Sequence, residues 1–100
     1  MIKTTILAAG MIAMGSSAFA AQNSCDISAY KICVESATVD LSSDCAQNNG
    51  TVGTTCSNEN QIGTCKVTQG DDSVTAHYYN GFPADAEKNC AENNGTFTRG

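Results

Sequence analysis

The sequence contains no tryptophan, a single histidine, and only five lysine or arginine residues against ten aspartate or glutamate residues. The shortage of basic residues argues against nucleic-acid binding, because an acidic surface repels phosphate backbones. It also leaves no basic amphipathic helix that could bind a membrane surface. With so few aromatic residues, a small domain buries only a modest apolar core, so its fold needs another source of stability.

The motifs of common catalytic and metal sites are missing as well. No Cys-x-x-Cys pair occurs, which argues against a thioredoxin-like redox site and against a zinc knuckle with closely spaced ligands. There is no Gly-x-Ser-x-Gly elbow for a serine nucleophile. Asp71 and Asp72 do not belong to an EF-type loop, so we expect them to be solvated turn residues and not calcium ligands. The sequence therefore predicts no catalytic residue, cofactor or metal site.

The first twenty residues have the pattern of an export signal. Lys3 supplies a positive charge, an apolar run follows at 6–14, and Ala-Phe-Ala at 18–20 fits a cleavage site. The apolar run is too short to cross a bilayer as a helix and no second one follows, so we favour a cleaved signal over a membrane anchor. Cleavage would leave residues 21–100 as one domain with a net charge of −6, since four basic residues then face ten acidic ones. We expect this domain, without a membrane span, in a bacterial periplasm or the medium.

Six cysteines follow the signal, and we predict that they form three structural disulfides. An even number of cysteines in a short exported chain is typical of a disulfide framework. Each bond would add about 2–4 kcal/mol, mainly by restricting the unfolded chain. The six are Cys25, Cys33, Cys45, Cys56, Cys65 and Cys90.

A short run of residues occurs twice in the chain. Residues 45–52 read Cys-Ala-Gln-Asn-Asn-Gly-Thr-Val, and residues 90–97 read Cys-Ala-Glu-Asn-Asn-Gly-Thr-Phe. This repeat predicts pseudo-symmetric halves at about 25–55 and 56–98. In this repeat Cys25, Cys33 and Cys45 correspond, in that order, to Cys56, Cys65 and Cys90.

The predicted fold is a small disulfide-rich α+β domain with two short helices on a mostly antiparallel sheet. Strands are predicted at about 30–35, 51–55, 62–68, 73–79 and 96–98, and helices after Asp40 and over 84–93. Asn49-Gly50 and Asn94-Gly95 are expected to end the helices, with Gly50 as the left-handed residue. Asn49 and Asn94 also match the Asn-x-Thr pattern of N-glycosylation sites. Because helix capping explains both residues, we do not expect glycosylation.

Local geometry favours one disulfide. If the chain turns near Gly70 and Asp71, Cys65 lies opposite Ala76, and the helix that follows brings Cys90 back to the same level. We therefore favour Cys65–Cys90. Carrying this pair over by the repeat suggests Cys33–Cys45, and Cys25–Cys56 would then join the halves.

One strand carries the candidate interaction residues. On the strand over 73–79, alternation places Tyr78 on one face and His77 and Tyr79 on the other. No nucleophile or orienting carboxylate stands beside His77 in the sequence, so we expect it to be a surface or edge residue. His77 and Tyr79 form a candidate patch for a protein or glycan partner.

Several short motifs together resemble a known group of proteins. Gly63-Thr64-Cys65, Tyr78-Tyr79, Cys90 and the Asn-Gly-Thr-Phe run at 94–97 are similar to the pattern of small exported bacterial proteins that carry cysteines. Many of those proteins are lipid-anchored and their function is not established. The resemblance covers most of the mature chain and implies one compact domain, but no activity. Polar residues precede Cys25, so the lipid anchor is not expected here.

These features favour a non-enzymatic binding or interaction module of the bacterial envelope or secretome. A structural or stress-tolerance component of the periplasm is an alternative. A thiol-based redox protein or small enzyme is a third, and it needs exchanging cysteines or an inward-facing acid pair such as Asp85 and Glu87. We rank this third hypothesis last, because the predicted helix places both carboxyls on the face away from Cys90 or at its side.

Overall fold

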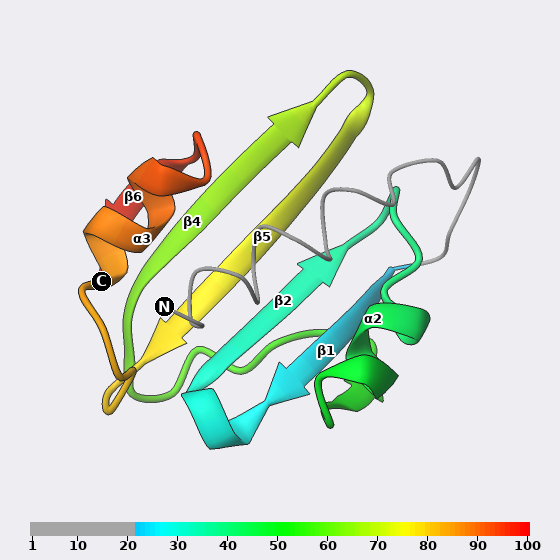
Figure 1. The fold of residues 1–100 in the computed structure, drawn as a ribbon, viewed down its shortest axis with the longest axis horizontal. Helices are drawn as coiled ribbons and strands as arrows, with labels where there is room; N and C mark the ends of the chain where they lie inside the picture. Colours follow the sequence, from blue (N-terminus) through cyan, green and yellow to red (C-terminus); the bar gives the residue numbers. More distant parts are fainter. Residues whose placement is uncertain (1–21) are drawn as a thin grey trace.

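The computed structural model describes residues 22–100, so the predicted export signal lies outside the described residues. This part of the chain forms a six-stranded sheet with two α-helices and one 3-10 turn (Figure 1), which confirms a disulfide-rich α+β fold. The elements are β1 (Asn23–Ile27), η2 (Ser28–Tyr30), β2 (Ile32–Ser36), α2 (Ser42–Gln47), β3 (Thr51–Gly53), β4 (Gln61–Gln69), β5 (Asp72–Tyr79), α3 (Ala86–Glu92) and β6 (Thr96–Arg99). The sequence prediction contained no strand at the position of β1.

The strands lie in the order β3-β1-β2-β5-β4-β6, and every neighbouring pair is antiparallel. Opposed residues of antiparallel strands point to the same face, so the register defines rows of side chains across the sheet. The row that faces the helices contains Val52, Cys25, Val34, Ala76, Cys65 and Phe97. Helix α2 packs against β1 and β3, and α3 packs against β4 and β6, toward opposite edges of the sheet (Figure 1).

The apolar core lies between this face and the two helices. Its fully or almost fully buried side chains are Ile27, Ile32, Val34, Val39, Leu41, Val67, Val74, Ala76, Tyr78 and Ala86, together with four cysteines. Tyr78 is the largest of them, and its ring packs edge-on against Phe82 with ring centroids 4.7 Å apart. Burial raises the pKa of Tyr78 far above its usual value, so its hydroxyl stays a neutral donor.

Both helices end in the same way, and asparagine takes the left-handed conformation that was predicted for Gly50. Asn49 and Asn94 each have φ of 59°. The next N–H, from Gly50 or Gly95, donates to the carbonyl of the cysteine five residues earlier, at 2.8 and 3.0 Å respectively. This is the Schellman pattern with asparagine at the left-handed position.

The structure contains three disulfides and no free cysteine among the described residues. They are Cys25–Cys45, Cys33–Cys56 and Cys65–Cys90. The pair Cys65–Cys90 is the one that hairpin geometry predicted, and Cys65 lies opposite Ala76 as expected.

The predicted pairs Cys33–Cys45 and Cys25–Cys56 are wrong. Cys25 belongs to the row that faces the helices, and it therefore reaches Cys45 in α2. Cys33 is one residue out of phase with its helix-facing neighbours, so it points to the opposite face and bonds to Cys56 there. The error arose because the undetected strand β1 left Cys25 without a predicted face.

Helix α2 buries one carboxyl group. Asp44 is almost fully buried, and its Oδ2 has no hydrogen-bond partner. Desolvation raises the pKa of this carboxyl above its usual value. The residue at the same place in α3, one position before the cysteine, is Asn89, and it accepts a hydrogen bond from the Tyr78 hydroxyl at 2.7 Å.

Replacing Asp44 with asparagine is expected to stabilise the protein by about 1 kcal/mol at pH 7, because a buried charge without a partner is removed. The charge also lies in the first turn of α2, where the helix dipole favours it, and this offsets part of the gain. A carboxyl with a raised folded-state pKa loses its stabilising contribution as the pH rises through that value, so the gain should vanish near pH 3. Urea unfolding at pH 7 and pH 3 measures this change in the free energy of unfolding. Asp71→Asn, at an exposed position, is the control. A gain of equal size at pH 3 would contradict the burial argument.

Candidate functional site

The sheet face that points away from the helices, here called the open face, carries a polar row of side chains. The row contains Thr51, Asp26, Cys33, His77, Thr64 and Thr98. Residues 54–60, here called the covering segment, run across this face from β3 to β4. The disulfide Cys33–Cys56 ties this segment to the sheet.

Hydrogen bonds hold the covering segment against successive strands. The Ser24 hydroxyl in β1 donates to the Thr55 carbonyl at 3.3 Å. The Tyr79 hydroxyl in β5 donates to the Ser57 carbonyl at 2.7 Å. All residues of the segment except Cys56 are exposed, so it is a thin cover and not part of the core.

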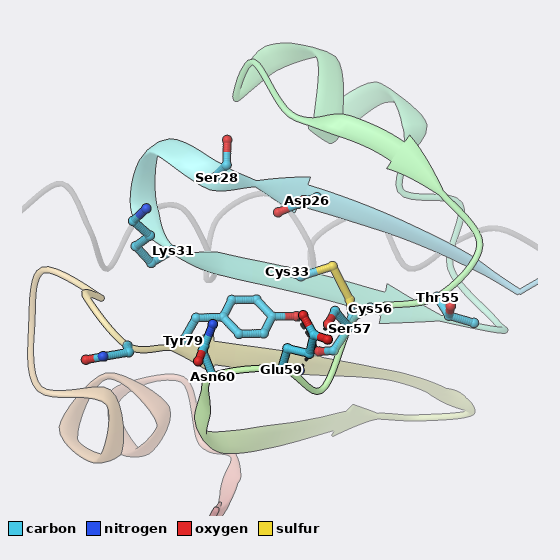
Figure 2. Close-up of a pocket in the computed structure, with 11 residues that line it drawn as sticks. Asp26, Ser28, Lys31, Cys33, Thr55, Cys56, Ser57, Glu59, Asn60 and Tyr79 are labelled. Atoms are coloured by element: carbon cyan, nitrogen blue, oxygen red, sulfur yellow. Dashed lines mark hydrogen bonds between the residues drawn. A yellow bond between two sulfur atoms is a disulfide. The ribbon is translucent and has the colours of Figure 1, made fainter.

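A pocket of about 410 Å³ opens between the covering segment and the ends of β1, β2 and β5 (Figure 2). Most of its lining residues are polar, and they carry both signs of charge, with Asp26 and Glu59 as the acidic residues and Lys31 as the basic one. The Tyr79 ring lies among these groups in Figure 2. Burial, and then the charges of Asp26 and Glu35, raise the pKa of Tyr79, so the hydroxyl remains a donor at neutral pH.

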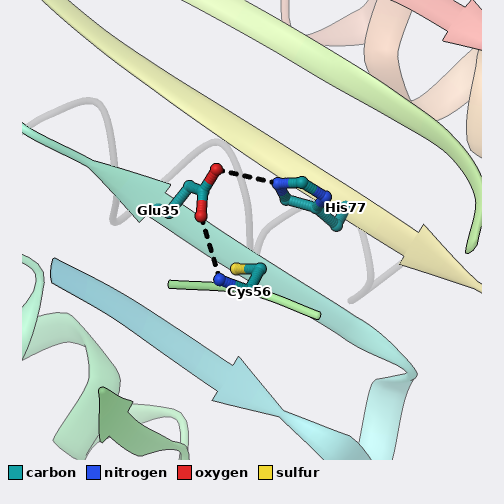
Figure 3. Close-up of side chains that lie close together, drawn as sticks. All are labelled: Glu35, Cys56 and His77. Atoms are coloured by element: carbon teal, nitrogen blue, oxygen red, sulfur yellow. Dashed lines mark hydrogen bonds and ion pairs between the residues drawn. The ribbon is translucent and has the colours of Figure 1, made fainter. Parts of the chain in front are cut away.

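A second cluster, here called the histidine cluster, consists of His77, Glu35, Gln61 and Cys56. Figure 3 shows Glu35, Cys56 and His77. His77 is only 7% exposed, and both of its ring nitrogens have partners. Nδ1 lies 2.6 Å from Gln61 Oε1, and Nε2 lies 3.0 Å from Glu35 Oε2. The other carboxylate oxygen of Glu35 accepts the backbone N–H of Cys56 at 2.9 Å.

A β-bulge brings Gln61 to the histidine. The register between β4 and β5 shifts between Gln61 and Gly63, which leaves Ile62 as the extra residue. Gln61 is thereby paired with Tyr79 on the open face, and its Nε2 donates to the Gly100 carbonyl at 2.7 Å. This bond orients the amide, so its oxygen faces His77 and accepts a hydrogen bond from Nδ1–H.

The two residues of the predicted interaction patch lie on the same face of β5 but differ in their surroundings. Tyr79 lines the pocket. His77 is buried, so its predicted position at the surface is wrong, and Glu35 provides the orienting carboxylate that sequence neighbours did not show. Glu35 lies 42 residues before His77, and only the pairing of β2 with β5 brings them together.

The acid pair that an enzyme hypothesis required does not form. Asp85 and Glu87 are both exposed. Asp85 caps α3 by accepting the Lys88 N–H at 3.1 Å, and Glu87 lies 3.6 Å from Arg99. Asp85 therefore caps the start of α3, and Glu87 pairs with the end of β6.

Known proteins offer no guide to this site. The chain matches no protein-family model, no curated protein and no solved structure. Within residues 22–100, no helix has the length and apolar character needed to cross a membrane. The three disulfides are consistent with an exported protein.

Proposed function

We propose that this chain is an exported, non-enzymatic binding module of a bacterial envelope, and that its pocket on the open face binds a sugar unit of a glycan. The observation that carries the proposal is the pocket of about 410 Å³, which is lined mostly by polar residues and by one aromatic ring. This volume is within the usual range of small-ligand sites, about 300–1,000 Å³. Sugars offer hydroxyl groups for carboxylates and amides and C–H faces for aromatic rings.

The pocket supplies these two kinds of group side by side. Asp26 and Glu59 accept hydrogen bonds from hydroxyls, and Lys31 and Asn60 donate them. Tyr79 offers its ring, while its own hydroxyl is engaged by Ser57. A concave polar site of this kind suits a small polyhydroxylated ligand better than a flat protein surface.

A protein partner is less well supported. Large exposed apolar side chains in the described chain are limited to Val52, which is 53% exposed, and Ile62, which is 41% exposed. They belong to different strands, β3 and β4, which the sheet order separates by three other strands. Single apolar residues on a surface are common and do not indicate an interface.

We also propose that residues 23–53 and 61–99 are two copies of one unit. Each runs strand, strand, helix, strand, and in each the first strand pairs with the other two. Cys25–Cys45 and Cys65–Cys90 each join the first strand to the helix of the unit. Cys56 then belongs to neither copy but to the connection between them.

Titration of the ¹⁵N-labelled protein with bacterial envelope sugars tests the binding proposal. A hexosamine or its oligomers should shift amide signals of the pocket residues, and Tyr79→Ala should weaken binding at least about tenfold, since a ring contact with the ligand is lost. Tyr79→Phe keeps the ring and should retain most of the affinity. Asp71→Asn, in the distant hairpin turn, is the control and should bind as the wild type does.

Two outcomes would overturn the proposal. One is the absence of shifts at millimolar sugar concentrations. The other is binding that Tyr79→Ala leaves unchanged, because the pocket would then not be the site.

A further inference from the structure

We propose that reduction of Cys33–Cys56 turns the histidine cluster into a zinc site whose ligands are Cys33, Cys56, His77 and Glu35. This inference does not depend on sugar binding, although Cys33 and Cys56 also line the pocket. The sequence analysis did not predict it, because only Cys33 and Glu35 are close neighbours along the chain, and Cys56 and His77 each lie 21 residues beyond the preceding ligand.

The four ligand groups already lie together. One ligand atom each of Glu35, Cys56 and His77 can be chosen so that all lie within 4.8 Å of one another. The sulfur of Cys33 is bonded to that of Cys56 and is therefore the fourth group. Two thiolates, one imidazole and one carboxylate are a donor set that Zn²⁺ accepts in tetrahedral geometry.

Groups around the cluster orient the ligands as metal sites require. Gln61 Oε1 accepts a hydrogen bond from Nδ1–H of His77, so Nε2 is directed into the cluster. The Cys56 N–H holds one oxygen of Glu35, which leaves Oε2 aimed at Nε2 from 3.0 Å.

Only this disulfide is open to a reductant. The cysteines of the other two bonds are fully buried between the sheet and the helices. Cys56 is partly exposed on the thin covering segment, and a disulfide must be accessible for exchange. With Cys25–Cys45 and Cys65–Cys90 intact, the core keeps its cross-links, and the exposed segment can shift to let the two sulfurs separate.

The exchange requires an external dithiol. One thiolate of the dithiol attacks the Cys56 sulfur and expels the Cys33 thiolate, and the second thiol then displaces Cys56 from the mixed disulfide. The dithiol becomes a cyclic disulfide, and two electrons and two protons pass to the protein as two thiols. Zinc binding then releases these two protons to solvent as both sulfurs become thiolates.

Limited reduction followed by metal titration tests the proposal. The folded protein is treated with dithiothreitol, freed of reductant without air, and titrated with Co²⁺ and then Zn²⁺. Alkylation and peptide mass mapping should label Cys33 and Cys56 alone. The reduced protein should bind one Co²⁺ with the visible and sulfur charge-transfer absorption of a tetrahedral thiolate site, Zn²⁺ should displace it, and the oxidised protein should show neither.

Variants separate this site from metal binding by the thiols alone. Glu35→Gln and His77→Gln should weaken Co²⁺ binding by more than about 100-fold, since each removes a ligand. Gln61→Met keeps all four ligands and should weaken binding by about 10-fold through loss of ring orientation. Asp72→Asn, a carboxyl at the far end of the same strand as His77, is the matched control and should bind as the wild type does.

Four results would overturn the proposal. They are labelling of the buried cysteines at the same rate as Cys56, loss of the near-ultraviolet circular dichroism on reduction, the absence of Co²⁺ binding, and unchanged Co²⁺ binding by His77→Gln.

Discussion

Replacing Gly95 with alanine is expected to destabilise the protein by about 3 kcal/mol, because the added methyl group would collide with a disulfide. A Cβ at this position would lie 2.4 Å from the Cys65 sulfur and 2.9 Å from the Cys90 sulfur. Both sulfurs are fully buried and bonded to each other, so they cannot turn aside as a flexible side-chain end could. A loss of this size would lower the melting temperature of a domain of this length by about 12–24 °C.

The same substitution at Gly50 should have a similar effect. Its Cβ would lie 2.5 Å from the Cys25 sulfur and 2.8 Å from the Cys45 sulfur. The repeated Asn-Asn-Gly run thus combines two functions, since the second asparagine ends the helix and the glycine makes room for the disulfide. Equal losses at Gly50 and Gly95 would also support the proposed repeat of the two units.

Gly70→Ala is the control for these variants. Gly70 has φ of +64°, and a Cβ there would meet no atom within 4 Å. Gly70→Ala should lower the free energy of unfolding by only about 1 kcal/mol, because backbone strain is its only effect. Thermal unfolding of all three variants measures the difference, and a loss at Gly95 no greater than that at Gly70 would contradict the collision argument.

The part of the fold that sequence predicts well is the part with short-range geometry. The turn at Gly70 and Asp71 sets the register of β4 and β5, and this register places Cys65 opposite Ala76. The helix that follows is near in sequence, so its return over the strand limits where Cys90 can lie. Local geometry alone therefore predicts the disulfide Cys65–Cys90.

In the first half of the chain, no local feature indicates the face on which Cys25 lies. Strand β1 is only five residues long and has buried and exposed positions that do not alternate strictly. It joins β2 through the turn at Ser28–Tyr30, where Lys31 takes a left-handed φ of 56° that its residue type does not suggest. Without β1, no face could be assigned to Cys25, and the pairing carried over by the repeat was wrong.

The histidine cluster depends on contacts that are distant in sequence. Alternation along the strand correctly placed His77 and Tyr79 on one face, but it does not show what covers that face. Burial of His77 results from the β2–β5 pairing that supplies Glu35, from a bulge that turns Gln61 toward the ring, and from the tether at Cys56. None of these three has a local sequence signal.

Removing Cys65–Cys90 by a double substitution to alanine is expected to cost about 5 kcal/mol, against about 3 kcal/mol for Cys33–Cys56. The three disulfides span 20, 23 and 25 residues, so their loop-closure terms are each about 3 kcal/mol and differ by only a few tenths. Chain entropy therefore predicts equal losses. The difference arises from packing, because both sulfurs of Cys65–Cys90 are fully buried and their removal leaves a cavity.

Urea unfolding without reductant of the three double-alanine variants measures these losses, and Cys25–Cys45 is the internal replicate. It is as deeply buried as Cys65–Cys90 and joins a strand to a helix in the same way, so its removal should cost about as much. Three equal losses would show that the core disulfides stabilise the protein only by restricting the unfolded chain, with no contribution from the packing of their sulfurs. A greater loss for Cys33–Cys56 than for either core bond would mean that the covering segment and the His77–Glu35 pair stabilise the sheet more than the packing beneath the helices. Reduction of Cys33–Cys56 would then endanger the fold, and a zinc site formed by that reaction would have no stable framework.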